Sequence, residues 1–244
     1  AQIRNLSTWK TFLGVREKKW YNEKDFTIES GIRVEEKHKK WICLGLFLIA
    51  MIVCFTTGCE KDFTSGDIEG YHYEETEEIT NYVKIVTNKD KVILIELYPE
   101  IAQITVENFQ KLVSEHFYDN LTFHRVIANF MIQTGDPTAT GAGGSDKKIQ
   151  GEFSLNGIEN TLKHEKGIVS MARSSDYDSA SSQFFICVSD NLEYLDGSYA
   201  AFGRVIAGYD AVEEISNVQT DGNNKPTTTQ KMETVRFVNV TKQE

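Results

Sequence analysis

From residue 81 onward, the chain consists mainly of short stretches rich in β-branched and aromatic residues, and this feature limits its fold most. Such stretches, bounded by polar turn residues, are typical of β-strands. The pattern predicts strands at residues 82–87, 91–98, 122–126, 131–134, 167–172, 183–188, 200–205 and 235–241. Asn88, Lys89 and Asp90 separate the first two strands and predict a hairpin turn.

Two segments among these strands have helical periodicity instead. Val106, Phe109, Leu112 and Val113 lie at the spacing of one helix face, and residues 210–217 form a second, shorter amphipathic pattern. Many short strands with two helices and no βαβ alternation predict a mainly β fold. We therefore expect a closed eight-stranded antiparallel β-barrel capped by two helices.

The N-terminal part carries a pattern of another kind. Basic residues 37–40 precede an uninterrupted apolar run at residues 41–55, which is the layout of an export signal. The run is shorter than the roughly 20 residues of a membrane-spanning helix. Gly58 and Cys59 resemble the lipobox of bacterial lipoproteins, in which the cysteine is lipidated, although Thr56 replaces the usual aliphatic residue.

Two interpretations of this signal stay open. Residues 34–58 are either a signal peptide removed before a lipidated Cys59 or an uncleaved signal anchor. Both place the later residues outside the cytoplasm, anchored to the bacterial cell membrane, because the basic side stays inside. Residues 1–33 are expected to be an N-terminal extension or the product of a misplaced start, and we assign them no function.

Charge is distributed unevenly along the chain. Residues 1–58 carry 10 basic and 6 acidic side chains, whereas residues 59–244 carry 16 and 30. An acidic body repels phosphate backbones, so nucleic acid is not expected as a partner. Residues 59–80 are acidic, lack a sustained apolar period and are expected to form a solvated tether before a folded domain at residues 81–244.

Common catalytic signatures are missing from the sequence. The five histidines are scattered, without HExxH or zinc spacing, and no serine lies in GxSxG. Cys187, within an apolar strand, is interpreted as a small buried hydrophobe, and no disulfide framework is expected. We therefore expect no metal and no cofactor.

Several longer motifs identify the domain. Residues 123–136 (FHRVIANFMIQTGD) are followed by GIVSMA at 167–172, SQFFI at 182–186, LDG at 195–197 and AFG at 201–203. In order and spacing these segments resemble those of the cyclophilins, over about residues 82–241. The resemblance implies a peptidyl-prolyl cis/trans isomerase with a cyclophilin-like barrel.

Site residues follow from the resemblance position by position. Arg125 is implied as the catalytic residue, and Gln133 as the side chain that binds the substrate backbone. The implied proline pocket and peptide groove comprise Phe130, Met131, Ala172, Arg173, Gln183, Phe185, Tyr194, Leu195 and Tyr199. His124 is interpreted as a structural histidine with satisfied hydrogen bonds.

Two of these positions depart from the pattern of the best-studied eukaryotic cyclophilins. Tyr194 stands where a Trp often occurs, and Tyr199 where a His often occurs. Because the Trp position contacts the inhibitor cyclosporin in the family, we expect weakened inhibition.

The implied reaction is isomerisation of X–Pro bonds without a covalent intermediate, with Arg125 stabilising the twisted amide. The expected partners are proline-containing polypeptides, above all unfolded exported proteins, and the protein is expected to be a monomer. The alternative is a non-catalytic chaperone or scaffold of the same fold that binds proline-containing segments. A donor at the prolyl nitrogen favours the enzyme, since binding alone does not need it.

Overall fold

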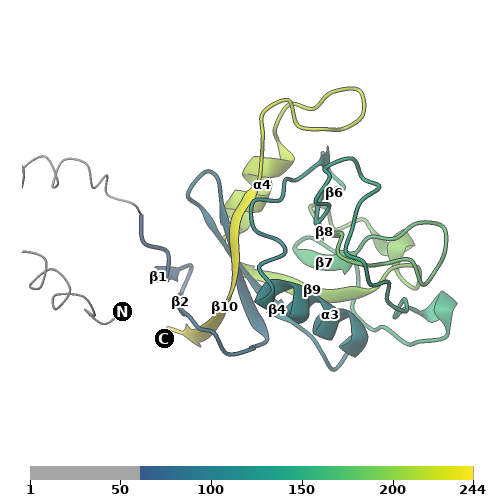
Figure 1. Ribbon diagram of the computed structural model, residues 1–244, viewed down its shortest axis with the longest axis horizontal. Helices are drawn as coiled ribbons and strands as arrows, with labels where there is room; N and C mark the ends of the chain where they lie inside the picture. The colour runs from purple at the N-terminus through teal and green to yellow at the C-terminus, as the bar shows by residue number, and fades with distance from the viewer. Residues whose placement is uncertain (1–60, 244) are drawn as a thin grey trace, which may run out of the picture. The chain divides into compact units, whose positions relative to one another are not determined.

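Antiparallel strands make up most of the protein (Figure 1). The structure is a computed structural model and describes residues 61–243. Its elements, in chain order, are β1 (Ser65–Ile68), β2 (Tyr71–Glu75), β3 (Tyr82–Thr87), β4 (Val92–Leu97), α3 (Gln103–Ser114), β5 (Arg125–Ile127), β6 (Met131–Thr134), the 3-10 turn η1 (Ser154–Asn156), β7 (Ile168–Met171), β8 (Phe184–Cys187), the 3-10 turn η2 (Glu193–Leu195), β9 (Ala201–Ala207), α4 (Tyr209–Ser216) and β10 (Met232–Lys242).

The mainly β fold with two helices is confirmed, and each predicted strand and helix has an observed counterpart. The largest shift concerns the strand predicted at residues 122–126, which begins at Arg125 instead. Thr122 forms a bridge with Lys231, and the Phe123 N–H donates to the Gln230 carbonyl at 2.9 Å. Residues 122–123 therefore pair with the segment that leads into β10, and only the residues after them pair with β6.

All ten strands belong to one antiparallel sheet in the order β1-β2-β10-β3-β4-β9-β7-β8-β6-β5. The sheet ends on β1 and on β5 and is not closed by a continuous ladder. Besides the Thr122–Lys231 bridge, the Met232 N–H donates to the Leu121 carbonyl at 2.9 Å. The closed eight-stranded barrel therefore stays a prediction, and β1 and β2 are two strands that the sequence did not predict.

The acidic segment before β3 is part of the sheet, so the prediction of a solvated tether is wrong for its described residues. β2 pairs with β1 on one side and with residues 238–242 of β10 on the other. Tyr73 of β2 is 4% exposed and packs in an apolar cluster with Leu94 and Val238. The acidic composition was misleading because the partner strand of β2 lies more than 160 residues further along the chain.

A buried lysine links this added hairpin to the sheet. Lys84 on β3 is 1% exposed, and its Nζ donates to Glu75 Oε2 at 2.7 Å and to the Phe63 carbonyl. The same Nζ lies 5.4 Å from the centre of the Tyr73 ring. A buried ammonium needs such partners to offset the cost of losing water. The hairpin is therefore an integral part of the folded unit.

The main core lies under the two helices, and Figure 1 shows α4 above the strands and α3 below them. The Phe109 ring of α3 contacts Tyr118, Phe184 and Phe202, with ring centres 5.0, 5.4 and 5.2 Å away. The first turn of α3 has no local side-chain cap. Instead, the Glu152 carboxylate accepts hydrogen bonds from the free N–H groups of Ile104 and Thr105.

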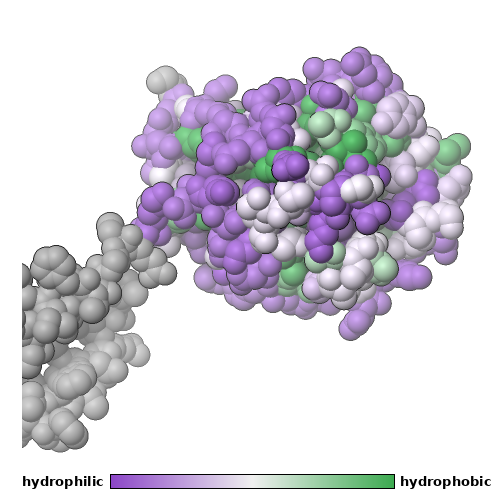
Figure 2. Space-filling view, turned by 90° about the horizontal axis from the view of Figure 1, so that it is seen from above, coloured by the Kyte–Doolittle hydropathy of each residue, from purple (hydrophilic) through white to green (hydrophobic). Residues whose placement is uncertain are grey.

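The surface shown in Figure 2 is mostly hydrophilic, with small hydrophobic patches between the polar side chains. Within residues 61–243, no helix has the length and apolar character needed to cross a membrane. The predicted extension at residues 1–33, the signal at residues 34–58 and the lipidation site Cys59 lie outside the described residues.

Candidate active site

A row of side chains crosses four neighbouring strands on one face of the sheet. Arg125 on β5 is opposite Gln133 on β6, Gln133 is opposite Phe185 on β8, and Phe185 is opposite Ser170 on β7. Directly opposed residues of adjacent strands project to the same face. The sheet register therefore brings the predicted catalytic Arg125 and the predicted Gln133 beside the predicted pocket residue Phe185.

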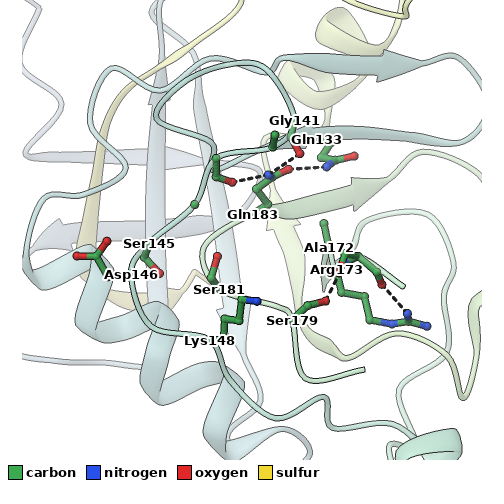
Figure 3. A pocket seen from close by; sticks show the side chains of 14 residues that line it. Gln133, Gly141, Ser145, Asp146, Lys148, Ala172, Arg173, Ser179, Ser181 and Gln183 are labelled. Carbon is green, nitrogen blue, oxygen red and sulfur yellow. Dashed lines mark hydrogen bonds between the residues drawn. The ribbon is translucent and has the colours of Figure 1, made fainter. Parts of the chain in front are cut away.

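Hydrogen bonds join the polar members of this row in one direction. Arg125 Nη1 donates to Gln133 Oε1 at 3.1 Å, and Gln133 Nε2 donates to Gln183 Oε1 at 2.8 Å. Gln183 Nε2 donates to the carbonyls of Gly141 and Gly143 at 3.1 and 2.7 Å (Figure 3). Because a carbonyl can only accept, the two loop carbonyls determine which way both amides face. The Gln133 oxygen is thereby directed at Arg125.

Asp136 holds the glycine-rich loop at residues 141–144 in place. Its carboxylate accepts hydrogen bonds from the backbone N–H groups of Thr138, Thr140, Gly141 and Gly143, at distances between 2.6 and 3.2 Å. Burial alone would raise the pKa of Asp136, but these bonds, together with that from the Thr138 hydroxyl, lower the pKa to about 2. A Cβ on Gly143 would collide with the Asp136 carboxylate, so this approach requires glycine.

The predicted apolar residues gather in a cluster separate from the main core. Met131, Phe185 and Leu195 are buried in it, and Phe130, Ala172 and Tyr199 pack against it partly exposed. Tyr194 is 66% exposed, with its ring centre 6.3 Å from that of Phe130. These side chains come from the β5–β6 turn, β6, β8, η2 and the segments that follow β7 and η2. The structure therefore brings six of the predicted residues together in this cluster, and Tyr194 lies exposed beside it.

Arg173 uses its guanidinium within the protein. Its Nε and Nη2 donate to the Ser198 carbonyl at 3.0 and 2.8 Å, and Nη1 donates to the Ser174 carbonyl at 2.8 Å. Three aromatic rings surround the guanidinium carbon at about 5 Å, those of Phe153, Tyr177 and Tyr199. Such cation–π contacts favour an arginine held in one position. Arg173 therefore connects the loop after β7 with the turn that carries Tyr199.

A cavity of about 370 Å³ lies beside the hydrogen-bonded glutamines. Gln133, Gln183, Ala172 and Arg173 line it together with the glycine-rich loop, Asp146 and Lys148 (Figure 3). Its lining is mostly polar side chains and backbone groups. Gln133 lines this cavity and lies directly opposite Phe185 of the apolar cluster, so it links the two parts of the site.

Two interpretations of single residues have opposite outcomes. Cys187 is fully buried, and burial raises its pKa to about 12, which confirms a small buried hydrophobe rather than a reactive thiolate. His124 is 6% exposed, but neither ring nitrogen makes a hydrogen bond of good geometry within the described residues, so the predicted hydrogen bonds are not found there. The Thr122 backbone and the Gln183 side chain nevertheless lie nearby. Burial lowers the pKa of His124, which favours a neutral ring.

Sequence reasoning missed two groups that support the site. Asp136 was quoted only as the last residue of a motif, and the hydrogen-bonded residues His164, Ser170 and Asp196 were not singled out at all. Asp136 could have been recognised from the Thr- and Gly-rich stretch that follows it, since such stretches form carboxylate-binding turns. For His164 and Asp196 no local signal exists, because 32 residues separate them.

A family model described as cyclophilin type peptidyl-prolyl cis-trans isomerase/CLD matches residues 82–237, which contain the whole row from Arg125 to Ser170. The chain belongs to this family. β1, β2 and the end of β10 lie outside the match, so the N-terminal hairpin is an addition to the cyclophilin domain.

Individual relatives agree with this assignment. A peptidyl-prolyl cis-trans isomerase of Schizosaccharomyces pombe is 42% identical over 145 residues, covering 59% of this chain and 90% of the relative. Peptidyl-prolyl cis-trans isomerase 10 of Caenorhabditis elegans is 42% identical over 144 residues, covering 59% of this chain and 87% of the relative. The predicted enzyme class, a peptidyl-prolyl cis-trans isomerase, is thereby confirmed.

Solved cyclophilin structures are also similar to this chain. A Cryptosporidium parvum cyclophilin, crystallised in the presence of the dipeptide Ala-Pro, has a TM-score of 0.59 and 32% identity and covers 64% of this chain and 98% of its own. A cyclophilin from Hirschia baltica has a TM-score of 0.54 and 26% identity, covering 67% of this chain and 75% of its own.

Proposed function

We propose that this cyclophilin accelerates cis/trans isomerisation of X–Pro bonds in polypeptides outside the cytoplasm, with Arg125 as the electrostatic catalyst. The observation that carries the proposal is the row formed by Arg125, Gln133 and Phe185 across β5, β6 and β8. It sets a hydrogen-bond donor beside an apolar pocket that has the chemical character to hold a proline ring.

The chemistry of this reaction suits such a site. Amide resonance keeps the X–Pro bond planar with a barrier of about 18–20 kcal/mol. At the twisted transition state the prolyl nitrogen regains a localised lone pair. A guanidinium that donates to this lone pair stabilises the transition state more than either planar form, which is what lowers a barrier. No covalent bond forms or breaks, and no proton leaves Arg125.

The apolar cluster supplies the second requirement. Met131, Phe185 and Leu195 are each less than 7% exposed, and Phe130 lies partly exposed beside them. A rigid apolar pocket can hold the proline ring while the preceding carbonyl rotates. Gln133 Nε2 has a second hydrogen besides the one donated to Gln183, and we assign it to the substrate backbone.

The proposed substrates are proline-containing segments of unfolded exported proteins, bound by a monomer. The Ala-Pro dipeptide named for the Cryptosporidium parvum cyclophilin supports a proline peptide as ligand. The membrane location is supported by the sequence around the apolar run and Cys59 alone, and the curated relatives from fungi and a nematode do not support a bacterial lipoprotein form. Intact mass of membrane-extracted protein tests it, since lipidation of Cys59 adds a diacyl group.

We also propose that the eight strands from β10 to β5 form a closed barrel in solution. The Thr122–Lys231 bridge and its two flanking hydrogen bonds lie where the first and last of these strands would meet. Slow amide hydrogen exchange at Phe123 and Met232 would support closure, whereas exchange as fast as in exposed loops would contradict it.

A protease-coupled assay on an X–Pro peptide tests the enzymatic proposal. Wild type is compared with Arg125→Ala and with the control Arg204→Ala. Arg204 lies on β9 and is paired with Glu165. We expect a loss of about a hundredfold in kcat/KM for Arg125→Ala only. Background activity in wild type would instead favour the non-catalytic binding module, and an unchanged Arg125→Ala would refute the role of Arg125.

A further inference from the structure

His164 lies buried beneath the proline pocket and makes three hydrogen bonds. It is 1% exposed, and it belongs to the segment before β7. Its Nδ1 lies 2.9 Å from Asp196 Oδ1, and its backbone N–H donates to the same oxygen at 2.9 Å. Its Nε2 lies 2.9 Å from the hydroxyl of Ser170, which is fully buried. His164 thus connects β7 with the segment that follows η2.

The charges around the ring determine how these bonds are polarised. Burial opposes ionisation of Asp196, but the hydrogen bonds from His164 and Lys163 outweigh it and lower the pKa of Asp196. An ionised carboxylate only accepts, so Nδ1 carries the proton and Nε2 accepts from the Ser170 hydroxyl. Burial also lowers the pKa of His164, in favour of the neutral ring that this pattern requires. Both ring nitrogens of His164 thereby have a hydrogen-bond partner, Asp196 at Nδ1 and Ser170 at Nε2.

Serine, histidine and aspartate joined in this order also form nucleophilic triads, but burial excludes that chemistry here. The hydroxyl of Ser170 has no exposed surface, and Phe185 on the neighbouring strand lies directly opposite it. A substrate carbonyl cannot reach the oxygen. The three residues must therefore act by positioning the side chains around them.

They hold both walls of the apolar pocket. The His164 ring is stacked on Phe185 with an interplanar angle of 19° and ring centres 6.2 Å apart. Tyr199 contacts the Phe185 ring edge-on, with ring centres 5.9 Å apart. Asp196 directly follows Leu195, and the N–H of Tyr199 donates to the Leu195 carbonyl at 3.2 Å. One imidazole therefore contacts Phe185 and anchors the turn that carries Leu195 and Tyr199.

We propose that His164 is a positioning residue, which sets the distance between Phe185 and the turn at residues 195–199 and so sets the affinity for the proline ring. This inference rests on the proposed function of the pocket. It concerns ground-state binding, because the hydrogen bonds of His164 do not include Arg125 or Gln133.

The test measures binding and turnover separately in the full-length chain. His164→Phe keeps an aromatic ring but loses the bonds to Asp196 and Ser170, and Asp196→Asn is the conservative variant because its amide oxygen still accepts from His164. The matched control is Asp119→Asn, which weakens a bidentate pair with Arg236 on β10 and lies outside the residues assigned to the pocket. Kd for an Ala-Pro peptide comes from calorimetry, and KM and kcat from the coupled assay.

We expect His164→Phe to raise Kd and KM about tenfold while kcat changes less than about twofold, and Asp196→Asn to stay within about threefold of wild type. Asp119→Asn should lower thermal stability without changing KM. Equal KM in His164→Phe and Asp119→Asn, or a loss confined to kcat, would overturn the proposal.

Two further outcomes are distinguishable. If His164→Phe does not fold, Ser170→Ala replaces it, and it should weaken peptide binding about threefold; unchanged binding there would overturn the inference. If wild type itself neither binds nor isomerises the peptide, the proposed function fails rather than the role of His164.

Discussion

Arg125 and Gln133 face each other across β5 and β6, and Arg125 Nη1 donates to Gln133 Oε1 over 3.1 Å. Gln133 faces this way because its Nε2 is engaged by Gln183, whose own Nε2 is engaged by two loop carbonyls. The position of Arg125, the proposed catalyst, thus depends on a chain of amides that ends at the glycine-rich loop. Neutral amide oxygens leave the guanidinium its full charge for the substrate.

Replacing that neutral amide should lower the rate. Gln133→Glu would place a carboxylate against Arg125 and another acceptor against Gln183 Oε1. The carboxylate would neutralise the charge of the Arg125 guanidinium, and its second oxygen would repel Gln183 Oε1. We therefore expect kcat/KM to fall by at least about tenfold in the protease-coupled assay. Gln110→Glu is the control, because the Gln110 amide is likewise held by a hydrogen bond, from Nε2 to the Thr80 carbonyl, but lies outside the site. Wild-type turnover in Gln133→Glu would contradict the dependence on amide orientation.

Asp136 should make stability depend on acidity. Its pKa in the folded protein is about 2, below the ordinary value of 3.8. As the pH falls, the unfolded chain therefore takes up this proton first, so the stabilisation is present above about pH 4 and is lost as the pH falls to about 2. We expect Asp136→Asn to cost about 2 kcal/mol at pH 7 and to approach wild type near pH 2.

Urea unfolding at several pH values measures this effect. Asp67→Asn serves as the control, since Asp67 is an exposed residue of β1. A difference between Asp136→Asn and wild type that stays constant from pH 7 to pH 2 would show that the carboxylate is not the cause.

The N-terminal hairpin should contribute to stability. Tyr73→Ala removes a side chain that is 4% exposed from the cluster around Leu94 and Val238, and we expect a loss of about 3 kcal/mol in the free energy of unfolding. Ile79→Ala, in the same acidic segment but 63% exposed, should change it by less than about 0.5 kcal/mol. Two equally small effects in urea unfolding would restore the tether interpretation.

Tyr194 should limit inhibition by cyclosporin. It is 66% exposed beside Phe130, at the position where the family often has Trp. An indole offers more apolar contact area and an N–H donor. We expect weak inhibition of wild type and about tenfold tighter inhibition of Tyr194→Trp, measured as the inhibitor concentration that halves turnover. Tyr71→Trp, on β2 of the N-terminal hairpin, is the control. Tight inhibition of wild type would refute this prediction.

Much of the domain could be predicted because its information is local. The β-branched-rich stretch at residues 82–87 and the helical spacing of Val106 and Phe109 report elements that form within a few residues. Met131, Phe185 and Leu195 also meet in one cluster, as the resemblance implied, and their role as a proline pocket stays a prediction. That prediction came from the order of the motifs in the family rather than from periodicity.

The errors share one cause, which is long sequence separation. β2 was missed because its partner is the end of β10, and the strand predicted at residues 122–126 shifted because Thr122 pairs with Lys231. The acidic segment was expected to be solvated because its composition does not reveal that β2 pairs with β10 or that Glu75 binds the buried Lys84. His124 was expected to be satisfied because a buried imidazole normally is, yet neither ring nitrogen makes a hydrogen bond of good geometry within the described residues, although the Thr122 backbone and the Gln183 side chain lie nearby.

The sequence alone determined the types of element, the family resemblance and the chemistry of the site, because side-chain periodicity and motif spacing are local properties. Only the tertiary structure decided how the site is supported. The direction of the Gln133 amide depends on carbonyls of a loop, and the pocket walls depend on a histidine 32 residues before its aspartate. The direction of a hydrogen bond and the burial of a side chain are decided only when distant segments meet, because a donor or acceptor can point in several directions until its partner is in place.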